Sequence, residues 1–431
     1  MKKIKRMNIA IIGLGNIGTY LYKYLKSNKN ILANKTNCTP NIVYVSAKNK
    51  LKKRNVKINK NKWLNNYLDA TKLKNIDLII ELIGGSEGAA KKLVFAALKN
   101  QKHVVTANKA LIAKYGDRLS KIAEENNVNL EFEAAVCGGV PIIRSLKEGL
   151  IANKITSVYG IFNGTSNYIL STMDKENANF KDVLLKAKKL GYAETNPLSD
   201  LNGDDVAAKL KILSSLCFNS FLNKNIHIEG INHIDKIDIE NANRLGYKIK
   251  LLGVSELINN KIYQRVHPTL IKKSSYIASI DGVLNAVIVD GKPVGRSVIQ
   301  GEGAGPEATT SALISDISSI LRGNIKFPFS ISNNERKKLI YRNIDDRIFS
   351  AYLRFEVIDK PGILSNITKI FSKNNVSIKR LIQNPNKSKK FSSIIIITHN
   401  SKNKSLNKII NQTENKSYIV KKPKLIRIGA I

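Results

Sequence analysis

The first third of the chain alternates short apolar runs with stretches in which apolar residues recur at helical spacing. The runs lie at residues 8–12, 42–46, 78–83, 103–106 and 129–133. Apolar runs of this length, separated by amphipathic helical segments, are typical of parallel strands buried on both faces of a sheet. The pattern therefore predicts an α/β protein that begins with a doubly wound, Rossmann-type dinucleotide-binding domain over residues 1–137.

The rest of the chain divides into a larger α+β section and a small terminal section. Residues 138–322 mix helical patterns with strand-like runs at 156–162, 261–267 and 286–289. They predict a catalytic and dimerisation domain whose end packs back on the nucleotide domain. A polar, basic stretch at 323–349 predicts a linker. Residues 350–431 follow the order strand, helix, strand, strand, helix, strand, which is the ferredoxin-like βαββαβ plan.

The net charge is the one unusual feature of the composition. Of the 431 residues, 71 are Lys or Arg and 33 are Asp or Glu, which gives a net charge of +38. Such a charge would attract nucleic acid or an anionic membrane. The basic residues are scattered, however, and form no stripe with interleaved aromatic residues. We therefore expect a solvated basic surface and no specific nucleic-acid partner.

Cysteine usage and the N-terminus indicate the compartment. The three cysteines Cys38, Cys137 and Cys217 have no C-x-x-C spacing, which favours a reducing environment. The apolar run near the start reaches Gly13 too soon for a signal peptide, and no apolar run is long enough to cross a membrane. We expect a cytoplasmic protein without a membrane partner. The five histidines are not spaced as zinc ligands.

A glycine-rich turn follows the first predicted strand. Gly13, Gly15 and Gly18 form the pattern G-x-G-x-x-G between a strand and a helix. The first glycine permits a tight turn, the second lets the backbone approach a pyrophosphate, and the third lets helix and strand pack closely. The start of the helix, at Asn16 and Ile17, would face the phosphates. This context favours a dinucleotide site over a purely structural turn.

The absence of an acidic residue near the end of the second predicted strand indicates which dinucleotide binds. Selection of NAD commonly uses an Asp or Glu near the end of the second strand, yet the first acidic residue after Gly13 is Asp69. The segment after that strand instead carries Ser46, Lys48, Lys50, Lys52, Lys53 and Arg54. We predict that Lys48 and its neighbours favour NADP(H) over NAD(H) through the ribose 2′-phosphate. The alternative is that these lysines only reflect the basic composition.

A second glycine-rich segment has two interpretations. Gly84, Ser86 and Gly88 satisfy the G-x-S-x-G pattern of a hydrolase nucleophile elbow. The chain already has a dinucleotide turn, and no histidine lies in a recognisable triad context. We expect these glycines to let the backbone approach the nicotinamide end of the cofactor instead.

A helix over part of residues 198–213 carries an unusual stripe. Asp205 and Lys209 lie on one helix face that continues as Ile212 and Leu216, so the stripe begins charged and ends apolar. On an exposed helix such a pair contributes only about 0.2–0.5 kcal/mol. A pair that points into a cleft is a better explanation of the pattern.

Lysine can supply the acid that carbonyl reduction needs. Hydride addition leaves an alkoxide, which an ammonium group can protonate. Lys109 follows a buried strand of the nucleotide domain, and Lys209 lies on the helix with Asp205. If both lysines meet in one cleft, we expect each to lower the pKa of the other, while Asp205 and Glu194 hold a cationic amine.

Seven segments occur in the order found in the homoserine dehydrogenase family: GLGNIG, ELIGG, VVTANKALIA, FEAAVCGGVPII, GIFNGTSNYIL, GYAETNPLSDLNGDDVAAKLKIL and GEGAGPEATTSALISDI. The resemblance runs from residue 8 to about residue 320 and is most specific over residues 191–213. The segment DKPGIL at residues 359–364 resembles an ACT regulatory domain.

The resemblance implies NAD(P)H-dependent, reversible reduction of L-aspartate 4-semialdehyde to L-homoserine, on the route to threonine, methionine and isoleucine. It implies that Lys209 donates the proton to the aldehyde oxygen and that Lys109 lies beside cofactor and substrate. Glu194 and Asp205 would bind the substrate amino group and order the site.

The resemblance also implies two sites built mainly from backbone. A monovalent cation, sodium or potassium, would be held largely through carbonyl oxygens by Glu133, Val136, Gly138 and Val140. A tight strand-to-helix turn explains these residues nearly as well. Gly303 and Gly305 would contact the cofactor, and Cys137 would be a tolerated small residue without a catalytic role.

The ACT-like tail implies feedback by an amino acid. Threonine is the expected effector, with the DKPGIL loop and Gln383 at its site, and pairing of such domains implies a homodimer or homotetramer. The alternative for the tail is oligomerisation alone. For the whole chain, the alternatives are another amino-acid-semialdehyde oxidoreductase, or a basic nucleic-acid-binding protein on an inherited dinucleotide fold.

Overall fold

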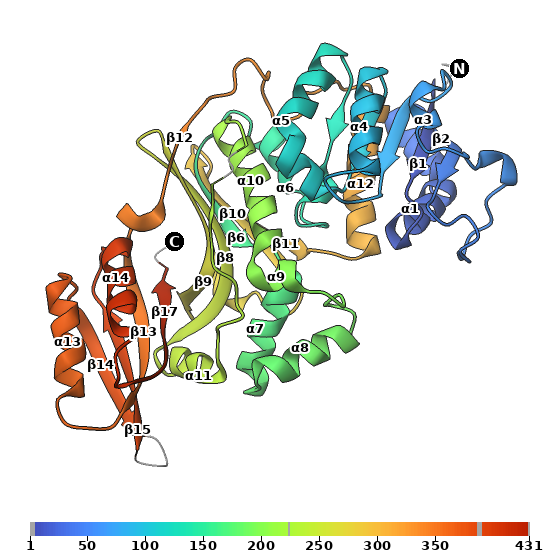
Figure 1. Ribbon diagram of the computed structural model, residues 1–431. Coiled ribbons are helices and arrows are strands. Elements are labelled where there is room, and N and C mark those ends of the chain that lie inside the picture. The colour runs from blue at the N-terminus through green and yellow to red at the C-terminus, as the bar shows by residue number, and fades with distance from the viewer. Residues whose placement is uncertain (1–4, 223–224, 386–389, 430–431) are drawn as a thin grey trace.

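The computed structural model describes residues 5–222, 225–385 and 390–429. Three parts follow one another along the molecule: a nucleotide domain in blue, a middle domain in green and yellow, and a terminal domain in orange and red (Figure 1). Among the described residues, no helix has the length and apolar character needed to cross a membrane.

The nucleotide domain is built on a parallel five-stranded sheet in the order β2-β1-β3-β4-β5. Its strands are β1 (Lys5–Ile12), β2 (Cys38–Ser46), β3 (Leu78–Glu81), β4 (His103–Thr106) and β5 (Leu130–Glu131). The five predicted strands are confirmed, although β3 and β5 end earlier than predicted because the chain turns after Glu81 and Glu131. The strand order reverses at β1 and β3, which is where doubly wound sheets open a crevice for ligands.

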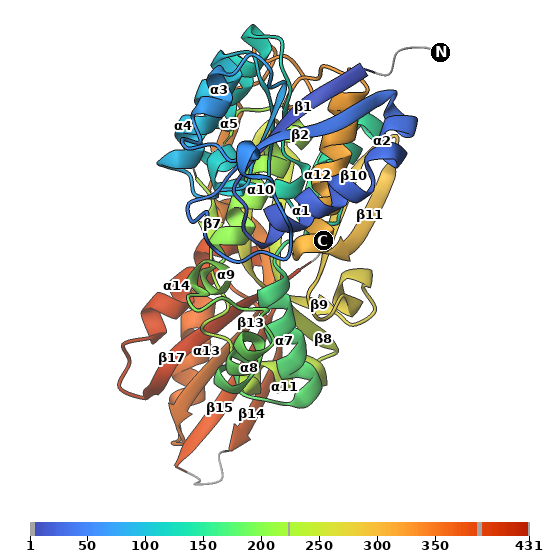
Figure 2. The same ribbon diagram turned by 90° about the vertical axis from the view of Figure 1, so that its right-hand side faces the viewer.

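Helices cover both faces of this sheet. The local ones are α1 (Asn16–Ser27), α2 (Lys29–Thr36), α3 (Asp69–Lys72), α4 (Ala89–Lys99) and α5 (Lys109–Glu125). A further helix, α12 (Pro306–Leu321), comes from far along the sequence and lies beside α1 (Figure 2). Its Leu313, Ile317 and Ile320 are buried in one cluster with Ile9 and Ile11 of β1, so the last helix of the middle domain completes the nucleotide-domain core.

The middle domain is built on antiparallel strands in the order β11-β10-β6-β8-β9. These are β6 (Lys154–Ile161), β8 (Tyr247–Ile258), β9 (Lys261–Lys272), β10 (Leu284–Lys292) and β11 (Gly295–Glu302), with the short β7 (His227–Ile228) beside β9. The helices are α6 (Ile142–Arg144), α7 (Gly164–Glu176), α8 (Phe180–Lys189), α9 (Leu198–Asn202), α10 (Asp204–Phe218) and α11 (Lys236–Arg244). Helix α10 is buried along most of its length because it packs between this sheet and α5 of the nucleotide domain.

The terminal domain has the predicted ferredoxin-like plan. Its elements are β13 (Ile348–Ile358), α13 (Ile363–Lys373), β14 (Ile378–Pro385), β15 (Phe391–Thr398), α14 (Asn403–Thr413) and β17 (Ile419–Ile428), with β16 (Ser401–Lys402) beside β13. The sheet order is β17-β13-β15-β14, and a separate apolar core lies between this sheet and the two helices.

The terminal sheet is continuous with the middle one. Strand β17 pairs in parallel with β9, so that Arg427 lies opposite Thr269 and Ile428 opposite Leu270. Arg354 of β13 binds Asp238 of α11 at 2.7 Å, and this aspartate is fully buried. Backbone and charge contacts therefore hold the terminal domain against the middle domain.

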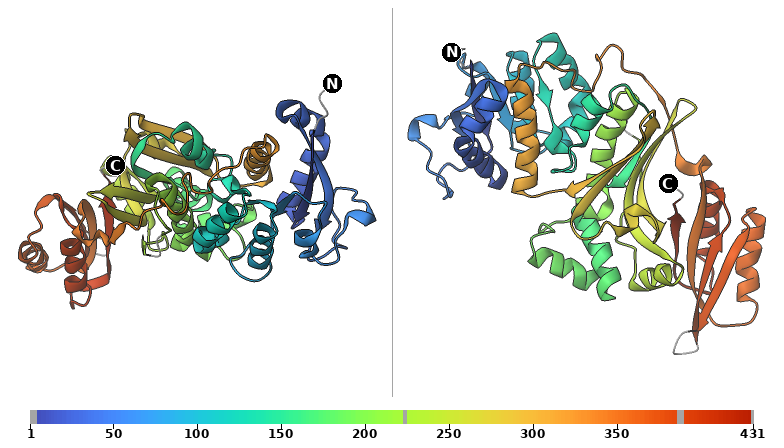
Figure 3. Two further views of the ribbon diagram at one scale, coloured as in Figure 1. Left: turned by 90° about the horizontal axis from the view of Figure 1, so that it is seen from above. Right: turned by 180° about the vertical axis from the view of Figure 1, so that it is seen from behind.

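The segment at 323–349, predicted to be a linker, runs from α12 to the terminal domain (Figure 3) and is anchored at several points. Phe329 is fully buried, and β12 (Ile340–Arg342) pairs with β9. The buried Arg336 donates hydrogen bonds to Asp117 Oδ1 at 2.6 Å and to Ser215 Oγ at 2.8 Å. The polar composition that indicated a linker therefore includes a guanidinium that joins α5 to α10.

Candidate active site

A cavity of about 650 Å³ lies where the nucleotide and middle domains meet. Its walls come from segments far apart in the sequence: Lys109, the turn around Cys137, the start of α7 at Gly164, the loop around Tyr192, the α9 and α10 region, and the turn at 302–305. The cavity brings together the four charged residues that the sequence singled out, Lys109, Glu194, Asp205 and Lys209.

The Asp205 carboxylate bridges two ammonium groups in this cavity. Lys109 Nζ lies 2.9 Å from Asp205 Oδ1, and Lys209 Nζ lies 2.8 Å from Asp205 Oδ2. Lys209 Nζ also donates a hydrogen bond to the Phe162 carbonyl oxygen at 2.6 Å. Asp205 and Lys209 are buried, whereas the Lys109 side chain is 43% exposed. Two lysines from different domains are thus held on one carboxylate.

Helix starts position these three charges. Gly203, with φ 89°, allows the chain to turn from α9 into α10, which puts Asp205 in the first turn of α10 and Lys209 one turn later. Asn108 caps α5 by accepting a hydrogen bond from the Leu111 N–H at 3.1 Å. Lys109 is therefore the first residue of α5, a helix end where a cation is unfavourable unless a carboxylate accompanies it.

The pKa shifts differ from those expected from the sequence. Burial raises the pKa of Asp205, but the charges of Lys209 and Lys109 outweigh it and hold that pKa well below its usual range. Burial lowers the pKa of Lys209, but the Asp205 charge outweighs it, and the net pKa is raised. The expectation that the lysines lower each other's pKa is wrong for Lys209, because a carboxylate lies between the two cations.

Two polar residues that the sequence analysis missed complete this cluster. Asn163 Nδ2 donates to Asp205 Oδ2 at 2.9 Å and to Asp200 Oδ1 at 2.7 Å. Asn163 Oδ1 accepts the Ser166 N–H at 2.7 Å, so the same side chain caps α7. Burial and the Asp205 charge raise the pKa of Asp200. Asn163 lies in the quoted segment GIFNGTSNYIL, where its local signal is that of an Asn that caps a helix, and nothing in the segment indicated its contact with Asp205.

Glu194 occupies a different part of the cavity wall. It lies on the loop between α8 and α9, is exposed, and lines the cavity. Among the described residues, no ion pair joins it to Lys109 or Lys209, and its expected role in holding a cationic amine stays a prediction. Its carboxylate remains available to a ligand.

The glycine turn after β1 has the geometry of a dinucleotide cradle. A Cβ on Gly13, with φ +113°, would lie 2.4 Å from the Leu82 carbonyl carbon, and one on Gly18 would lie 2.1 Å from the Gly13 oxygen. A Cβ on Gly15 would meet nothing within 4 Å. Two glycines therefore permit close packing, while the third leaves open space at the start of α1 for a pyrophosphate.

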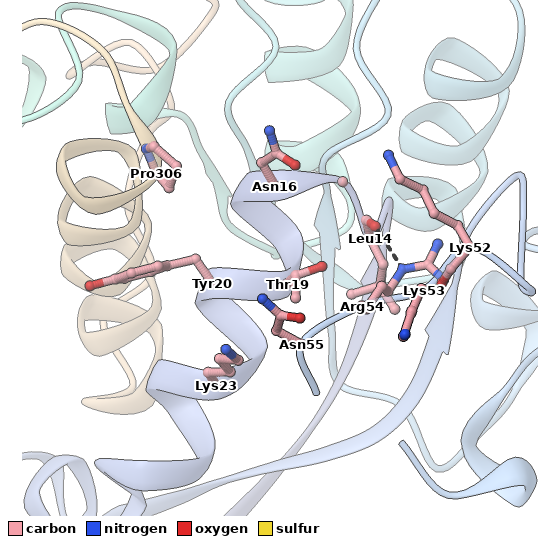
Figure 4. Close-up of a pocket in the computed structure, with 11 residues that line it drawn as sticks. Leu14, Asn16, Thr19, Tyr20, Lys23, Lys52, Lys53, Arg54, Asn55 and Pro306 are labelled. Atoms are coloured by element: carbon pink, nitrogen blue, oxygen red, sulfur yellow. Dashed lines mark hydrogen bonds between the residues drawn. The ribbon is translucent and has the colours of Figure 1, made fainter. Parts of the chain in front are cut away.

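A second cavity, of about 300 Å³, adjoins this turn (Figure 4). It is lined by the start of α1, by Pro306 and by the basic loop at Lys52 and Lys53. Arg54 fixes that loop, because its Nε donates to the Leu14 oxygen at 3.0 Å and its Nη2 to the Asn49 oxygen at 2.7 Å.

Lys48 lies apart from the lining of this second cavity. It is exposed just after β2, whereas Lys52 and Lys53 belong to the cavity wall. The basic segment predicted from the sequence is therefore next to the glycine turn, but its later lysines are the ones nearest the site.

Two further glycines lie on the turn between β11 and α12. Gly303 packs against Asn285 so closely that a Cβ would lie 2.2 Å from the Asn285 Cγ. Gly305, with φ +106°, precedes α12 and faces open space. Both line the main cavity, as does Ile17 of α1. Gly138 packs against this turn, because its Cβ would lie 2.7 Å from the Gly303 oxygen.

The turn at 133–140 is organised by the buried carboxylate of Glu133. Its oxygens accept the Ile143 N–H at 2.9 Å and the Arg144 N–H at 2.6 Å, and so cap α6. Burial raises the pKa of Glu133 to about 7. The turn continues through Val136, Gly138 and Val140, and Val140 accepts the Ile142 N–H at 2.8 Å. Within the described residues, no group of three His, Cys, Asp or Glu side chains is arranged for a metal ion.

The G-x-S-x-G segment is not a nucleophile elbow. Strand β3 ends at Glu81 and α4 begins at Ala89, so Ser86 lies in a loop between them and not at a sharp strand-to-helix turn. Glu81 Oε1 accepts the Ile83 and Gly84 N–H groups at 2.7 and 3.0 Å. The buried carboxylate thus shapes the glycine loop, and the hydrolase alternative is rejected.

Comparison with known proteins identifies the family. The model of the homoserine dehydrogenase family matches residues 141–318, and that of the homoserine dehydrogenase NAD binding domain matches residues 13–133. A homoserine dehydrogenase of Neisseria gonorrhoeae is 37% identical over 437 residues, covering 99% of this chain and 100% of that protein. The chain belongs to the homoserine dehydrogenase family. The resemblance inferred from the seven segments is confirmed.

Other homoserine dehydrogenases extend the match to the whole chain. The Helicobacter pylori protein is 38% identical over 425 residues, covering 98% of this chain and 99% of that protein. The crystal structure of a homoserine dehydrogenase from Thiobacillus denitrificans superposes with a TM-score of 0.92 at 36% identity, covering 100% of this chain and 99% of that one. An ACT domain model matches residues 351–416, which confirms the predicted class of the terminal domain.

Replacing Gly15 tests the cofactor cradle. Gly15→Val should leave the melting temperature near that of the wild type, because the position is open and has φ −75°. It should weaken dinucleotide binding about tenfold or more, because the side chain would occupy the space that a pyrophosphate needs. Fluorescence titration with NADPH measures this. Gly18→Val is the contrasting variant and should lower the melting temperature; equal NADPH affinity in Gly15→Val and wild type would contradict the assignment.

Proposed function

We propose that the chain catalyses the reversible, NAD(P)H-dependent reduction of L-aspartate 4-semialdehyde to L-homoserine. The observation that carries this proposal is the Lys109–Asp205–Lys209 cluster in a cavity that also reaches the start of α1 and the turn at 303–305. The dinucleotide, when bound on the glycine turn, supplies the hydride. The chain has to supply orientation, a proton and a water-poor environment.

Lys209 is the proton donor in this mechanism. An ammonium group has three N–H donors, and two of those on Lys209 are engaged by Asp205 and the Phe162 carbonyl. The third is available to an aldehyde oxygen in the cavity. Because the Asp205 charge raises the pKa of Lys209, the donor stays protonated at neutral pH and gives up its proton only when an alkoxide develops.

Carboxylates and Lys109 position the amino acid. Glu194 and Asp200 line the cavity and carry the negative charge that a substrate ammonium needs. Lys109 is half-exposed and can bind a substrate oxygen, while Asp205 holds it in place. Glu194 and Asp205 were assigned to substrate from the family resemblance, and the geometry supports adding Asp200.

NADP(H) is the proposed dinucleotide. Lys52 and Lys53 lie across the second cavity from the start of α1, where the ribose next to the pyrophosphate would lie. Their charges suit a 2′-phosphate, and their place in the wall favours them over Lys48 for this contact.

We also propose the cation and the regulation that the family resemblance implied. Glu133 gives the turn at 133–140 a buried carboxylate, but its oxygens already accept two backbone N–H groups. The carbonyl oxygens of Val136, Gly138 and Val140 would therefore be the main ligands of sodium or potassium. Threonine is the proposed effector at the DKPGIL loop, near the exposed Gln383, and the assembly is proposed to be a homodimer or homotetramer.

Substitution of the proton donor tests the reaction. Lys209→Ala should lower kcat for aspartate semialdehyde reduction by about three orders of magnitude or more, because acid catalysis and electrostatic stabilisation are both lost. NADPH affinity should stay near that of the wild type. Lys211→Ala, on the same helix outside the cavity, is the control. If Lys209→Ala keeps the wild-type kcat, Lys209 is not the proton donor. If the wild type reduces only other semialdehydes, the proposed substrate is wrong.

The pH profile tests the role of Asp205. In the wild type the donor form of Lys209 persists as pH rises past the usual lysine pKa of 10.5, because its pKa is raised. In Asp205→Asn, burial is no longer offset by that charge, so the pKa falls and the alkaline loss of kcat should move to lower pH. Asp204→Asn, an exposed neighbour in the same helix turn, is the matched control. If kcat falls at the same alkaline pH in the wild type, Asp205→Asn and Asp204→Asn, the role assigned to Asp205 is refuted.

Charge reversal in the basic loop tests dinucleotide selection. Lys52→Glu should lower kcat/KM for NADPH about tenfold or more and change kcat/KM for NADH much less, because a charge-assisted contact to phosphate contributes about 1.5–3 kcal/mol. Lys48→Glu, in the same segment but outside the cavity wall, should change neither value appreciably. A stronger effect at Lys48 would restore the assignment made from the sequence.

A further inference from the structure

A cavity of about 470 Å³ lies between the middle and terminal domains, away from both cavities of the active site. On one side it is lined by Glu229, Gly230 and His233, which follow β7. On the other side it is lined by residues of α14 and β17, among them Asn411 and Lys424. Both domains are needed to form its walls.

The walls of this junction cavity carry an excess of positive charge. Lys422 and Lys424 both line it, and Lys424 Nζ donates to the His233 carbonyl oxygen at 2.5 Å. The nearest carboxylates are 3.5 Å from Lys422 Nζ, on Glu414, and 3.7 Å from Lys424 Nζ, on Asp235. Each pair is long and has one side chain that is more than half exposed, so it neutralises little of the lysine charge.

The one carboxylate in the wall is already compensated. Glu229 accepts from Arg427 Nη1 at 2.8 Å, and His227 Nε2 lies 2.6 Å from its other oxygen. Burial raises the pKa of Glu229, but these partners outweigh it, and the carboxylate stays ionised. Arg427 is itself fully buried and is not one of the residues that line the cavity, so the uncompensated charge of the wall comes from Lys422 and Lys424. A small anion is the ligand that such a wall lacks.

The cavity also has apolar surface beside the lysines. Ile410, Pro423 and Leu425 contribute to it, together with the amides of Asn407 and Asn411. A cationic group beside a short apolar surface and two amides suits an organic carboxylate better than a bare inorganic ion. We propose that the junction cavity is a binding site for a small organic carboxylate, and that its occupancy is transmitted to the active site.

The coupling follows from how the loop at 229–232 packs. Gly230 lies so close to α9 that a Cβ would be 2.1 Å from the Leu201 oxygen and 2.6 Å from the Asn202 Cα. The Ile231 N–H donates to the Leu201 oxygen at 2.8 Å. A ligand that displaces this loop must therefore displace α9 as well.

Helix α9 carries this displacement to the catalytic residues. It contains Asp200, and it ends at Asn202, three residues before Asp205. Asp200 and Asp205 are joined through Asn163. A shift of α9 would change the position of both carboxylates, and hence the binding of an amino-acid substrate. This part of the inference rests on the proposed function, whereas binding at the cavity does not.

The junction cavity is distinct from the proposed effector site at the DKPGIL loop. Gln383 lies on β14, and β17 lies at the opposite end of the four-stranded terminal sheet, in the order β17-β13-β15-β14. The two sites can therefore be separated by substitution.

Binding is tested by thermal unfolding of the full chain with acetate, L-threonine, L-methionine and inorganic phosphate as probes. At least one carboxylate probe should raise the wild-type melting temperature by a few degrees, more than phosphate does. Asn411→Phe, which fills the cavity, should abolish the rise. Asn415→Phe, an exposed Asn outside the cavity wall, and Gln383→Ala should keep it. Any of three results overturns the site. The first is no rise with any carboxylate, and the second is a larger rise with phosphate. The third is a rise that is lost in Gln383→Ala but kept in Asn411→Phe.

Coupling is tested by hydrogen exchange with and without the probe that binds. Saturating probe should slow exchange at residues 229–232 and change it at 198–203 in the wild type, with no change at 198–203 in Asn411→Phe. The KM for aspartate semialdehyde should shift by about twofold or more in wild type and Asn415→Phe only. Slower exchange confined to the cavity overturns the coupling. Absence of any dehydrogenase activity would refute the proposed function while leaving the exchange and melting results to decide the site.

Discussion

The carboxylate of Asp205, held between two ammonium groups, is the constraint on which the site depends. One of its partners, Lys109, belongs to the nucleotide domain, whereas Lys209 lies with Asp205 on α10 of the middle domain, so the Lys109–Asp205 ion pair crosses the domain boundary. Buried charges of this kind contribute little net stability, and they are costly when one partner is removed. The arrangement is therefore better explained by chemistry, because it keeps a buried lysine protonated in the wall of the main cavity, where the proposed reaction needs an acid.

The rest of the fold can be understood as support for that cluster. Helix α12 returns to the nucleotide domain and fixes the turn at 303–305 against Gly138. Strand β6 leads directly to Phe162, whose carbonyl holds Lys209, and β6 is joined through β8 and β9 to β17 of the terminal domain. One continuous sheet thus runs from the strand that leads to Phe162, beside Lys209, to the ACT domain, and so connects that domain physically to the main cavity.

The sequence predicted those features that depend on short patterns. The strands of the nucleotide domain, the glycine turn and the βαββαβ tail could be predicted because each depends on local periodicity or on residues a few positions apart. The direction of the pKa shift of Lys209 could not be predicted, because it depends on a direct, buried ion pair between Lys209 and Asp205. Asn163 and Asp200 were missed because a hydrogen bond between remote side chains leaves no periodic signal.

Loop conformation explains the remaining differences. The basic segment after β2 was expected to act through Lys48 and its neighbours. Arg54 binds backbone oxygens at both Leu14 and Asn49 and folds the loop so that Lys52 and Lys53, and not Lys48, line the cavity. The segment at 323–349 looked like a linker because it is polar, yet Arg336 in it is a buried partner of Asp117. In both cases a guanidinium that binds distant atoms decides the path of the chain.

The distribution of charge also suits the orientation of the two proposed ligands, the dinucleotide and the amino acid, in a protein with a net charge of +38. The cavity beside the glycine turn has Lys52 and Lys53 in its wall. The wall of the main cavity has more carboxylates than cations, with Glu194, Asp200, Asp205 and Glu302 against Lys109 and Lys209. Asn16 lines the first and Ile17 the second, so the two cavities adjoin at the start of α1. In the proposed reaction, the anionic phosphates would be drawn to one side and the substrate ammonium to the other. The reacting ends of the two molecules would then meet between the two cavities, beside Lys209.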